Sequence, residues 1–324
     1  MKDFTICVGT IGTGLWRSPD GGETWGLVQT GLWLESRVFS LVVHPRDPRI
    51  LYAGTDNGLY RSQDRGASFE RLDSPMNALH VWKVALDPVD PDTIFAGTRP
   101  SALFRSHDGG QTWEKLAVDM ADECPNVRIP RVTSLVVDPS DHNIIWAGIE
   151  VDGVRRSLDG GKTWTRITDG LRDPDIHDIR VSAAASKTVL TSTPWEIFAS
   201  ADAGESWQRL EVGKHFGQPY YCRGLALKED APGVIFAGTG DAPLGSTGAI
   251  RRSKDGGQSW ETLPLPVKPN SPIWTFATAP ADPNLILACS HYGELFVSRN
   301  GGDSWEKLQR EFAEIRSLAW TPNA

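Results

Sequence analysis

The sequence has few of the features that would assign it to a common class of protein. Its four cysteines, Cys7, Cys124, Cys222 and Cys289, are far apart and form no CxxC pair, so neither a disulfide framework nor a thiolate zinc site is expected. No apolar run approaches the length of a membrane span, and the first ten residues lack the apolar core of a secretory signal. We therefore expect a cytoplasmic protein.

An excess of basic residues is also missing. Lysine and arginine number 33 against 41 aspartates and glutamates, which gives a formal net charge of −8. Broad binding to nucleic acid or to an anionic membrane needs a basic surface. We therefore expect neither nucleic acid nor membrane as a partner, although a local basic pocket remains compatible with this charge.

Turn-forming residues and tryptophan are abundant instead, with 32 Gly, 22 Pro and 13 Trp in 324 residues. One eight-residue pattern, Ser-x-Asp-x-Gly-x-Thr/Ser-Trp/Phe, recurs seven times. Ala203 occupies the fourth position, which is usually Gly, and Asn300 occupies the third position in place of Asp. The copies occupy residues 18–25, 62–69, 106–113, 157–164, 200–207, 253–260 and 298–305. Their Asp or Asn positions are 43 to 53 residues apart, a spacing typical of propeller blades.

Each period contains four strand-like runs, which we name A to D. In the second period they are FSLVVHP, ILYAGT, GLYRS and SFERL. Prolines between A and B have no N–H to donate to a sheet ladder, which indicates that these segments are turns. The repeated box lies between C and D, where its Asp can accept hydrogen bonds from turn amides. The chain starts in a B run and ends in an A run, IRSLAWTP. The pattern predicts an all-β, seven-bladed β-propeller of four-stranded antiparallel blades, a single domain over residues 1–324, closed when the last strand completes the first blade.

At these boxes the sequence resembles the Asp-box, or bacterial neuraminidase repeat (BNR), propellers, which include sialidases, oligoxyloglucan-acting glycosidases, sortilin ectodomains and photosystem II assembly factors. The resemblance covers every blade and implies the propeller fold. It implies several functions rather than one, because function depends on the site that a fold carries. The box aspartates are explained by the fold, and we expect them to be structural.

The face on which the A strands begin, here called the top face, is the expected place for a binding site. Alignment of the A strands puts one residue of each at the mouth: Arg37, His80, Arg131, Asp175, Tyr221, Pro272 and Glu314. Two residues further in are Phe39, Trp82, Thr133, His177, Arg223, Trp274 and Arg316. These side chains are chemically diverse, unlike the apolar residues deeper in the strands, so a purely structural ring does not explain them.

Several arginines in these two rings favour an anionic ligand on a protein whose net charge is negative, because guanidinium groups match carboxylates and phosphates. The predicted ligand-binding residues are Arg37, His80, Trp82, Arg131, His177, Arg223, Trp274, His291 and Arg316. The arginines could instead pair with Asp175, Asp178, Glu314 and Glu150 and hold the blades together. Trp82, Trp195 and Trp274 could stack on a sugar ring or serve as packing.

Three functions remain open. The first is hydrolysis of a glycosidase or sialidase type, for which the candidate catalytic residues are Tyr221, Glu196, Asp178 and Glu314. Here Arg128-Ile129-Pro130 resembles the end of the sialidase Phe-Arg-Ile-Pro motif, and Tyr220 or Tyr221 with Glu196 would imitate the sialidase Tyr–Glu pair. The second is non-catalytic binding of a peptide terminus or a partner protein. The third is a metal-dependent enzyme, with a divalent ion held by His80, His177, His215 or His291. No cofactor is required by the sequence.

Overall fold

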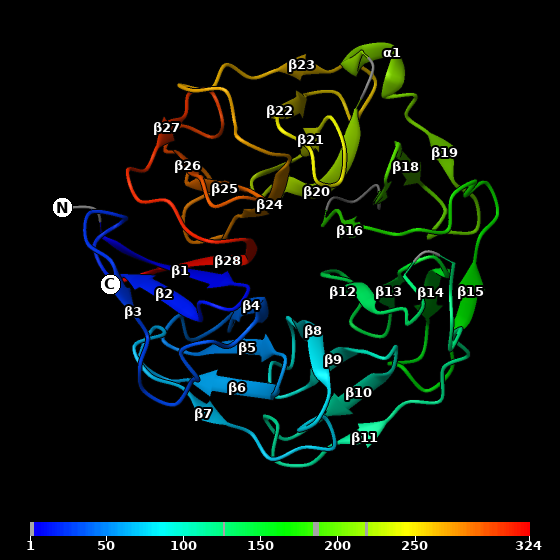
Figure 1. Cartoon of the computed structure of the whole chain (residues 1–324). Coiled ribbons are helices and arrows are strands. Elements are labelled where there is room, and N and C mark those ends of the chain that lie inside the picture. Colours follow the sequence, from blue (N-terminus) through cyan, green and yellow to red (C-terminus); the bar gives the residue numbers. More distant parts are fainter. Residues whose placement is uncertain (1–2, 126, 184–187, 218–219) are drawn as a thin grey trace.

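The structure, a computed structural model, describes residues 3–125, 127–183, 188–217 and 220–324. Its strands form seven antiparallel sheets of four strands each, arranged as blades around a central axis (Figure 1). The predicted fold is therefore confirmed. No helix in the described ranges is long and apolar enough to cross a membrane.

The strands of each blade follow the predicted A-to-D order from the axis outward. The innermost, or A, strands are β28 (Ile315–Pro322), β4 (Val38–Val43), β8 (His80–Leu86), β12 (Val132–Val137), β16 (Asp178–Val181), β20 (Tyr221–Lys228) and β24 (Ile273–Ala277). The B strands are β1 (Phe4–Thr10), β5 (Leu51–Thr55), β9 (Ile94–Arg99), β13 (Ile145–Ile149), β17 (Val189–Thr193), β21 (Ala231–Gly240) and β25 (Ile286–Ser290). The C strands are β2 (Leu15–Ser18), β6 (Gly58–Ser62), β10 (Leu103–Ser106), β14 (Gly153–Ser157), β18 (Glu196–Ser200), β22 (Gly248–Ser253) and β26 (Leu295–Ser298).

The outermost strands are short. They are β3 (Gly26–Leu27), β7 (Glu70–Arg71), β11 (Glu114–Lys115), β15 (Thr165–Ile167), β19 (Gln208–Arg209), β23 (Glu261–Thr262) and β27 (Glu306–Lys307). One short helix, α1 (Gly213–Phe216), lies between β19 and β20. Short outer strands leave little unpaired edge for another chain to pair with.

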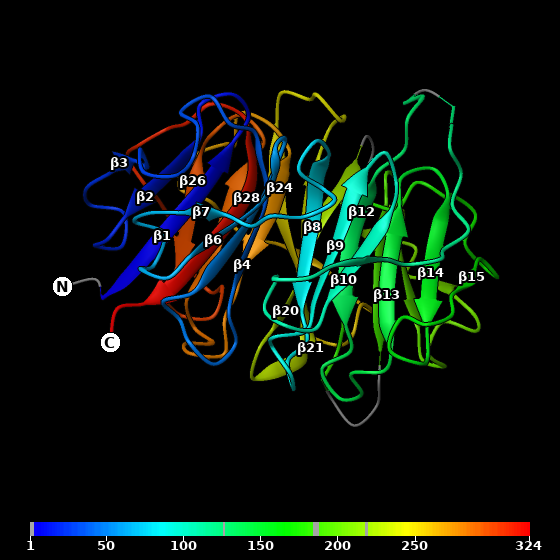
Figure 2. The same cartoon turned by 90° about the horizontal axis from the view of Figure 1, so that it is seen from below.

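The ring is closed by the two ends of the chain. Strand β28 pairs with β1 along its length, with Ile6 opposite Trp320 and Val8 opposite Leu318. The termini therefore lie side by side on the same blade (Figure 2). This pairing removes the radial gap that a linear chain of blades would leave.

The Asp-boxes are tight turns between the C and D strands, as expected. In the third box the carboxylate of Asp108 accepts hydrogen bonds from the backbone N–H groups of Gln111 (2.9 Å) and Thr112 (2.8 Å) and from the Thr112 hydroxyl (2.6 Å). In the seventh box Asn300 reproduces this arrangement, because its Oδ1 accepts from the Ser304 N–H and its Nδ2 donates to the Ser304 hydroxyl, both at 2.9 Å. Every hydrogen-bonding group on these side chains has a role in the turn.

The apolar core lies between neighbouring blades rather than in one central mass. In one cluster, for example, Trp146 of the fourth blade packs with Phe198 and Trp207 of the fifth. The A strands contact one another around the ring, and their loops to the D strands of the preceding blades lie on the top face together with the B–C loops (Figure 2). The top face therefore brings together loops from all seven blades.

Candidate functional site

Seven side chains, one from each blade, surround a small cavity on the axis of the propeller. They are Phe39, Trp82, Thr133, His177, Arg223, Trp274 and Arg316. These are the residues that A-strand alignment placed in the inner ring, and the structure brings all seven together. The cavity holds about 40 Å³, close to the share of one water molecule in the liquid, about 30 Å³. We call this constriction the waist and the wider opening above it the mouth.

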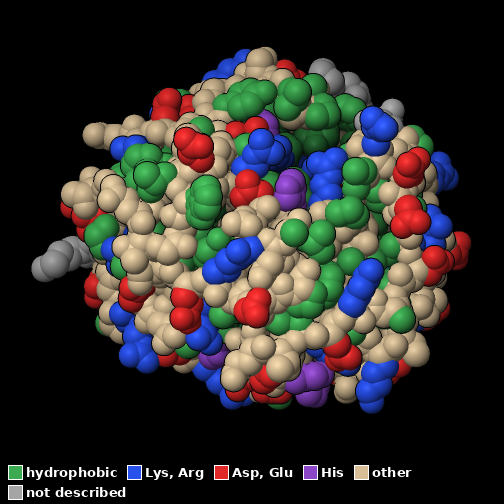
Figure 3. Space-filling view, turned by 60° about the horizontal axis from the view of Figure 1, so that its bottom comes forward, with side chains coloured by type: hydrophobic (Ala, Val, Ile, Leu, Met, Phe, Trp, Pro, Cys, Tyr) green, Lys and Arg blue, Asp and Glu red, His purple; other side chains and the backbone are tan. Residues whose placement is uncertain are grey.

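The mouth is a polar hollow on the top face. Figure 3 shows it obliquely, with basic, acidic and histidine side chains gathered in the hollow and hydrophobic side chains around it. Of the predicted outer ring, Tyr221 and Pro272 are buried, His80, Arg131, Asp175 and Glu314 are half-buried, and Arg37 is exposed. The predicted funnel is therefore present, but it narrows to the waist within two residues of strand.

The two tryptophans of the inner ring carry arginines on their faces. Trp82 is stacked on Phe39, with ring centroids 4.1 Å apart and planes 15° apart, and the Arg131 guanidinium lies 4.1 Å from its ring. The guanidinium carbons of Arg223 and Arg316 lie 4.1 Å and 4.6 Å from the Trp274 ring. Cation–π contacts of this kind fix the position of a guanidinium. Sugar stacking on these two rings, one alternative from the sequence, is therefore disfavoured because their faces are occupied.

The three arginines differ in their ionic partners. Arg131 pairs with Glu150, and Arg316 pairs with Glu314. Within the described residues Arg223 has no carboxylate partner, and its Nη1 lies 3.4 Å from the Tyr221 hydroxyl. Burial lowers the pKa of Arg131 to about 10 although Glu150 opposes this shift, and the charges of Arg223 and Arg316 lower it further. Three cations therefore share one poorly hydrated space.

Several buried polar atoms at the mouth and the waist lack a hydrogen-bond partner in the described part of the chain. They are Nε of Arg131, Nε of Arg316, Nε1 of Trp82, Oε2 of Glu150, Oδ1 of Asp175 and both ring nitrogens of His291. Buried polar groups in folded proteins are nearly always satisfied by protein, water or a ligand. The mouth is therefore equipped to bind a polar group.

The two buried histidines at this level remain neutral bases. His177 Nδ1 donates to the Cys222 carbonyl at 2.8 Å, while its Nε2 lies 3.5 Å from Asp175. Burial, reinforced by the charges of Arg316 and Arg223, lowers the pKa of His291 to about 3. Burial and Arg223 likewise lower the pKa of His177.

The histidines do not form the metal site that one hypothesis required. His80 stacks on Phe39 with ring centroids 5.6 Å apart, and His215 is exposed on α1. Across the described ranges no group of three or more His, Cys, Asp or Glu side chains is placed to hold a metal ion. The geometry thus gives this alternative no support.

The four candidate catalytic residues are not brought together. Tyr221 and Glu314 lie at the mouth, whereas Glu196 uses its oxygens to accept hydrogen bonds from Arg209 (2.8 and 2.9 Å) and from the N–H groups of Ile197 and Val212. Glu196 is therefore committed to holding β18 and β19, and it is not free to activate Tyr221. Arg128, from the sialidase-like tripeptide, is exposed in the loop between β11 and β12.

Asp178 lies at the waist, but its carboxylate is also engaged. It accepts hydrogen bonds from the N–H groups of Leu225 and Ile179 and from Arg180 Nη2, each at 3.0 Å. These contacts tie the fifth blade to the sixth. These hydrogen bonds give Asp178 a structural role, and its catalytic role stays a prediction.

Two carboxylates at the mouth, Glu150 and Asp175, have opposite pKa shifts. Burial raises the pKa of Glu150, although Arg131 opposes this shift, and Asp175 raises it further. Burial alone would raise the pKa of Asp175, but His177, Arg223 and Arg131 outweigh it and lower that pKa. Lys83, which also lines the waist, was missed, because it lies between the inner ring and the apolar position that follows it in the strand.

Comparison with known proteins agrees with this architecture. A family model described as "Sortilin, neurotensin receptor 3" matches residues 13–124. Among curated proteins, a probable oligoxyloglucan-reducing end-specific xyloglucanase from Neosartorya fischeri is 23% identical across 84% of this chain and 40% of its own length. A xyloglucanase from Paenibacillus sp. is 28% identical across 76% of this chain and 23% of its own length. The photosystem II assembly lipoprotein Ycf48 from Synechococcus sp. is 24% identical across 84% of this chain and 76% of its own length.

Solved structures with the same fold include the GH74 xyloglucanase from Xanthomonas campestris, with a TM-score of 0.67, 22% identity, and coverage of 90% of this chain and 46% of that one. Another is YCF48 bound to D1 peptide, with a TM-score of 0.56, 16% identity, and coverage of 84% and 82%. The chain is thus a seven-bladed β-propeller that is similar in sequence to the sortilin family model over residues 13–124 and, at below 30% identity, to curated xyloglucanases and to Ycf48. It spans less than half the length of the two curated xyloglucanases named above, 40% and 23%.

Proposed function

We propose that this propeller is a binding module whose top-face mouth recognises the carboxylate of a ligand. The observation that carries the proposal is the convergence of Arg131, Arg223 and Arg316, each held against a tryptophan face. Pre-positioned guanidiniums lose little conformational freedom on binding, and their planar donor groups match a carboxylate. Arg223, which has no carboxylate partner among the described residues, is the expected centre of recognition.

The surroundings of the mouth favour a polypeptide as the ligand. Large hydrophobic side chains are exposed on loops of the same face: Trp33 at 72%, Trp195 at 46%, Leu244 at 73% and Tyr292 at 42%. Exposed apolar residues around a polar centre are typical of protein interaction sites. A chain end could place its carboxylate in the mouth and its apolar side chains on these loops. The relative solved as "YCF48 bound to D1 peptide" shares the fold and is consistent with such a use.

The test is selection from a library of heptapeptides with free C-termini, compared with the same library carrying C-terminal amides. We expect the wild-type protein to enrich free-acid peptides only. The Arg223→Met variant should bind the enriched peptides at least about tenfold more weakly, since a charge-assisted hydrogen bond contributes roughly 1.5–3 kcal/mol. Arg61→Met is the matched control, because Arg61 pairs with Glu70 on the outside of the second blade. Equal enrichment of acids and amides would contradict the proposal.

Glycoside hydrolysis is a second candidate, favoured by the opposed pKa shifts of Glu150 and Asp175 and by the curated xyloglucanase relatives. Pairs of carboxyl groups whose pKa values are pushed apart often act as acid and base. In this reading Glu150 is the proton donor. Glycoside hydrolysis would be supported if the wild-type protein releases reducing ends from xyloglucan and a folded Glu150→Gln variant does not. It would be contradicted if the wild-type protein releases none from xyloglucan or from a uronic-acid polymer.

A further inference from the structure

At one position in the A strands, a polar side chain forms a hydrogen bond with a backbone group of the neighbouring blade. The bonds run from Val84 N–H to Ser40 Oγ (3.2 Å), from Ile179 N–H to Ser134 Oγ (3.0 Å), from Leu225 N–H to Asp178 Oδ2 (3.0 Å), and from Ser317 Oγ to the Val38 carbonyl (3.0 Å). Each satisfies a backbone group on the edge of an A strand that no other strand pairs with. A short polar side chain at this position is therefore explained by the fold.

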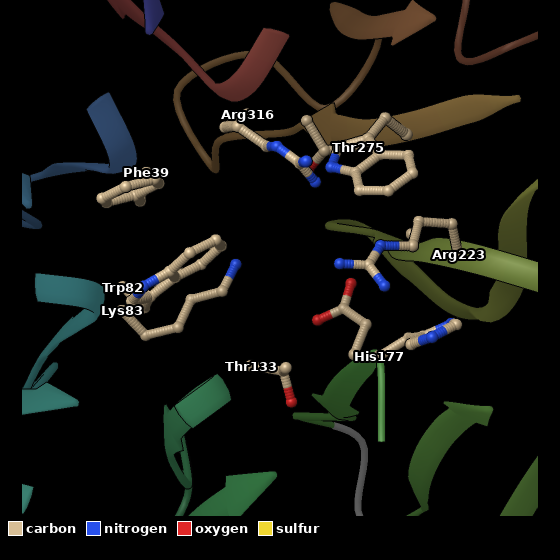
Figure 4. A pocket seen from close by; sticks show the side chains of 11 residues that line it. Phe39, Trp82, Lys83, Thr133, His177, Arg223, Thr275 and Arg316 are labelled. Carbon is tan, nitrogen blue, oxygen red and sulfur yellow. The ribbon is translucent and has the colours of Figure 1, made fainter. Parts of the chain in front are cut away.

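Lys83 occupies the same position in the third blade, and the fold does not explain it. A lysine ammonium has donors but no acceptor, so it cannot accept a bond from a neighbouring N–H. Within the described ranges Lys83 makes neither a hydrogen bond nor an ion pair, although it lines the waist. In Figure 4 its side chain points into the waist, toward the space that Arg223 and Arg316 also face. An unpaired cation in the interior is costly unless something compensates it.

A second, larger compartment begins at Lys83 and continues to the opposite face. It holds about 680 Å³ and reaches the A–B turns, and Phe39, Lys83, Asp178 and Arg316 are among the residues that it shares with the waist. The five residue-to-residue steps from Ser40 to Pro45, both of which line it, give it a depth of about 16 Å at roughly 3.3 Å per step. Its volume lies within the range of small-molecule sites, about 300–1,000 Å³. We call it the lower compartment.

The wall of the lower compartment combines apolar side chains with polar groups. Lining side chains include Val42, Val136, Leu227, Phe276 and Leu318. The rim carries six prolines, which have no backbone N–H: Pro45, Pro48, Pro139, Pro232, Pro280 and Pro322. The hydrogen bonds between blades satisfy part of the strand edges, so an apolar ligand would not cover a continuous row of open polar groups.

Most cations that line this compartment have an ionic partner. Near the rim Lys228 pairs with Asp230, and at the inner end Arg316 pairs with Glu314 and Arg180 with Asp178. Glu229, which accepts a hydrogen bond from Thr278 at 2.8 Å, lies at the rim. The Lys83 ammonium is the lining cation at the inner end that has no ionic partner among the described residues.

We propose that the lower compartment is a second binding site, which takes a linear monocarboxylate with an apolar chain. The carboxylate lies against Lys83, and the chain extends toward the A–B turns. This site goes beyond the proposed function, because it opens on the opposite face and its ligand lies against Lys83 rather than Arg131; the two sites meet at Arg316, which lines both the waist and the lower compartment.

The protonation state of Lys83 makes the site sensitive to pH. Burial lowers the pKa of Lys83 to about 8; Asp178 opposes this shift, whereas Arg180, Arg223 and Arg316 add to it. These four charged groups are the ones that face the amine. Lys83 is therefore mainly protonated at neutral pH and loses its charge above about pH 8, so carboxylate binding weakens as the pH rises from 7 to 9.

The experiment is calorimetric titration of the full chain with sodium octanoate, with octanol as the uncharged control. We expect saturable binding of octanoate at pH 7, at least tenfold weaker binding of octanol, and a fall in octanoate affinity at pH 9. Lys83→Met, which keeps the length of the side chain without its charge, should lower octanoate affinity at least tenfold, and Arg61→Met should not change it. Ala279→Trp, at a residue that lines the compartment, should also weaken binding.

Absence of octanoate binding, or equal affinity for octanoate and octanol, would overturn the proposal without the need for any variant. Octanoate binding that survives Lys83→Met but is lost in Arg131→Met would place the ligand at the mouth and would overturn it as well. Absence of octanoate binding would leave peptide recognition at the mouth to its own test with free-acid and amidated peptides, whereas octanoate binding lost in Arg131→Met would support a carboxylate site at the mouth.

Discussion

Replacement of Asp178 by alanine is predicted to destabilise the propeller, because its carboxylate joins the fifth and sixth blades. The change leaves the Leu225 N–H without its acceptor and removes the partner of Arg180. An unsatisfied buried donor costs about 1–3 kcal/mol. Loss of the ion pair adds less than a fully buried pair would, because the Arg180 side chain is 36% exposed. Together these effects give a loss of about 3 kcal/mol.

Thermal and guanidinium unfolding, followed by tryptophan fluorescence and circular dichroism, measure this loss. With an unfolding entropy of roughly 2.1 cal/mol/K per residue, 3 kcal/mol corresponds to a fall in Tm of about 4 °C for a chain of this size. Asp178→Asn, which keeps one acceptor oxygen, should lose about half as much. Asp122→Ala, at an exposed carboxylate, is the control and should change little. If Asp178→Ala were as stable as the wild-type protein, the structural role of Asp178 would be refuted and a functional role would return to consideration.

Two further predictions concern the turns. Hydrogen bonds from the Thr112 hydroxyl and N–H, together with Ser106, lower the pKa of Asp108 from 3.8 to about 2 in the folded state. The ionised Asp108 therefore stabilises the folded state fully well above pH 4, and this stabilisation is lost as the pH falls from about 4 toward 2. Replacing box aspartates by asparagine, the residue already present at Asn300, should reduce the pH dependence of urea unfolding in this window, and an unchanged dependence would contradict the assignment. Gly31→Ala should destabilise the chain far more than Gly12→Ala in the same urea assay. Both glycines have positive φ (85° and 77°), but a Cβ at Gly31 would lie 1.5 Å from the Phe69 carbonyl oxygen, whereas a Cβ at Gly12 would have nothing within 4 Å. Equal losses of stability would show that only the φ value matters.

The fold could be predicted from sequence because its defining contacts are local. In each Asp-box the carboxylate, its hydroxyl partners and the turn amides lie within a few consecutive residues, so the pattern records the structure directly. The pairing of the last strand with the first blade was also predictable, because the sequence begins in a B run and ends in an A run. The inner ring was also predictable, because one A strand per blade in the same register brings equivalent residues to the axis.

The chemistry of the site depends on contacts between blades, which a repeat pattern does not record. Arg131 covers the Trp82 face from 49 positions further along the chain, and this contact decides that the ring is not a free sugar platform. Glu196 was placed in the site by its loop, but Arg209 on the neighbouring strand holds it elsewhere. Lys83 was overlooked because alignment by apolar and aromatic positions skips the residue between them.

The affinity of one selected peptide as a free acid and as its C-terminal amide tests the central claim most directly. Both forms would be titrated into the wild-type protein at pH 7 under identical salt. If Arg131, Arg223 and Arg316 recognise a carboxylate at the mouth, the free acid should bind at least about tenfold more tightly than the amide, as expected for one charge-assisted contact. Equal affinities would mean that the arginines serve only to hold the blades together.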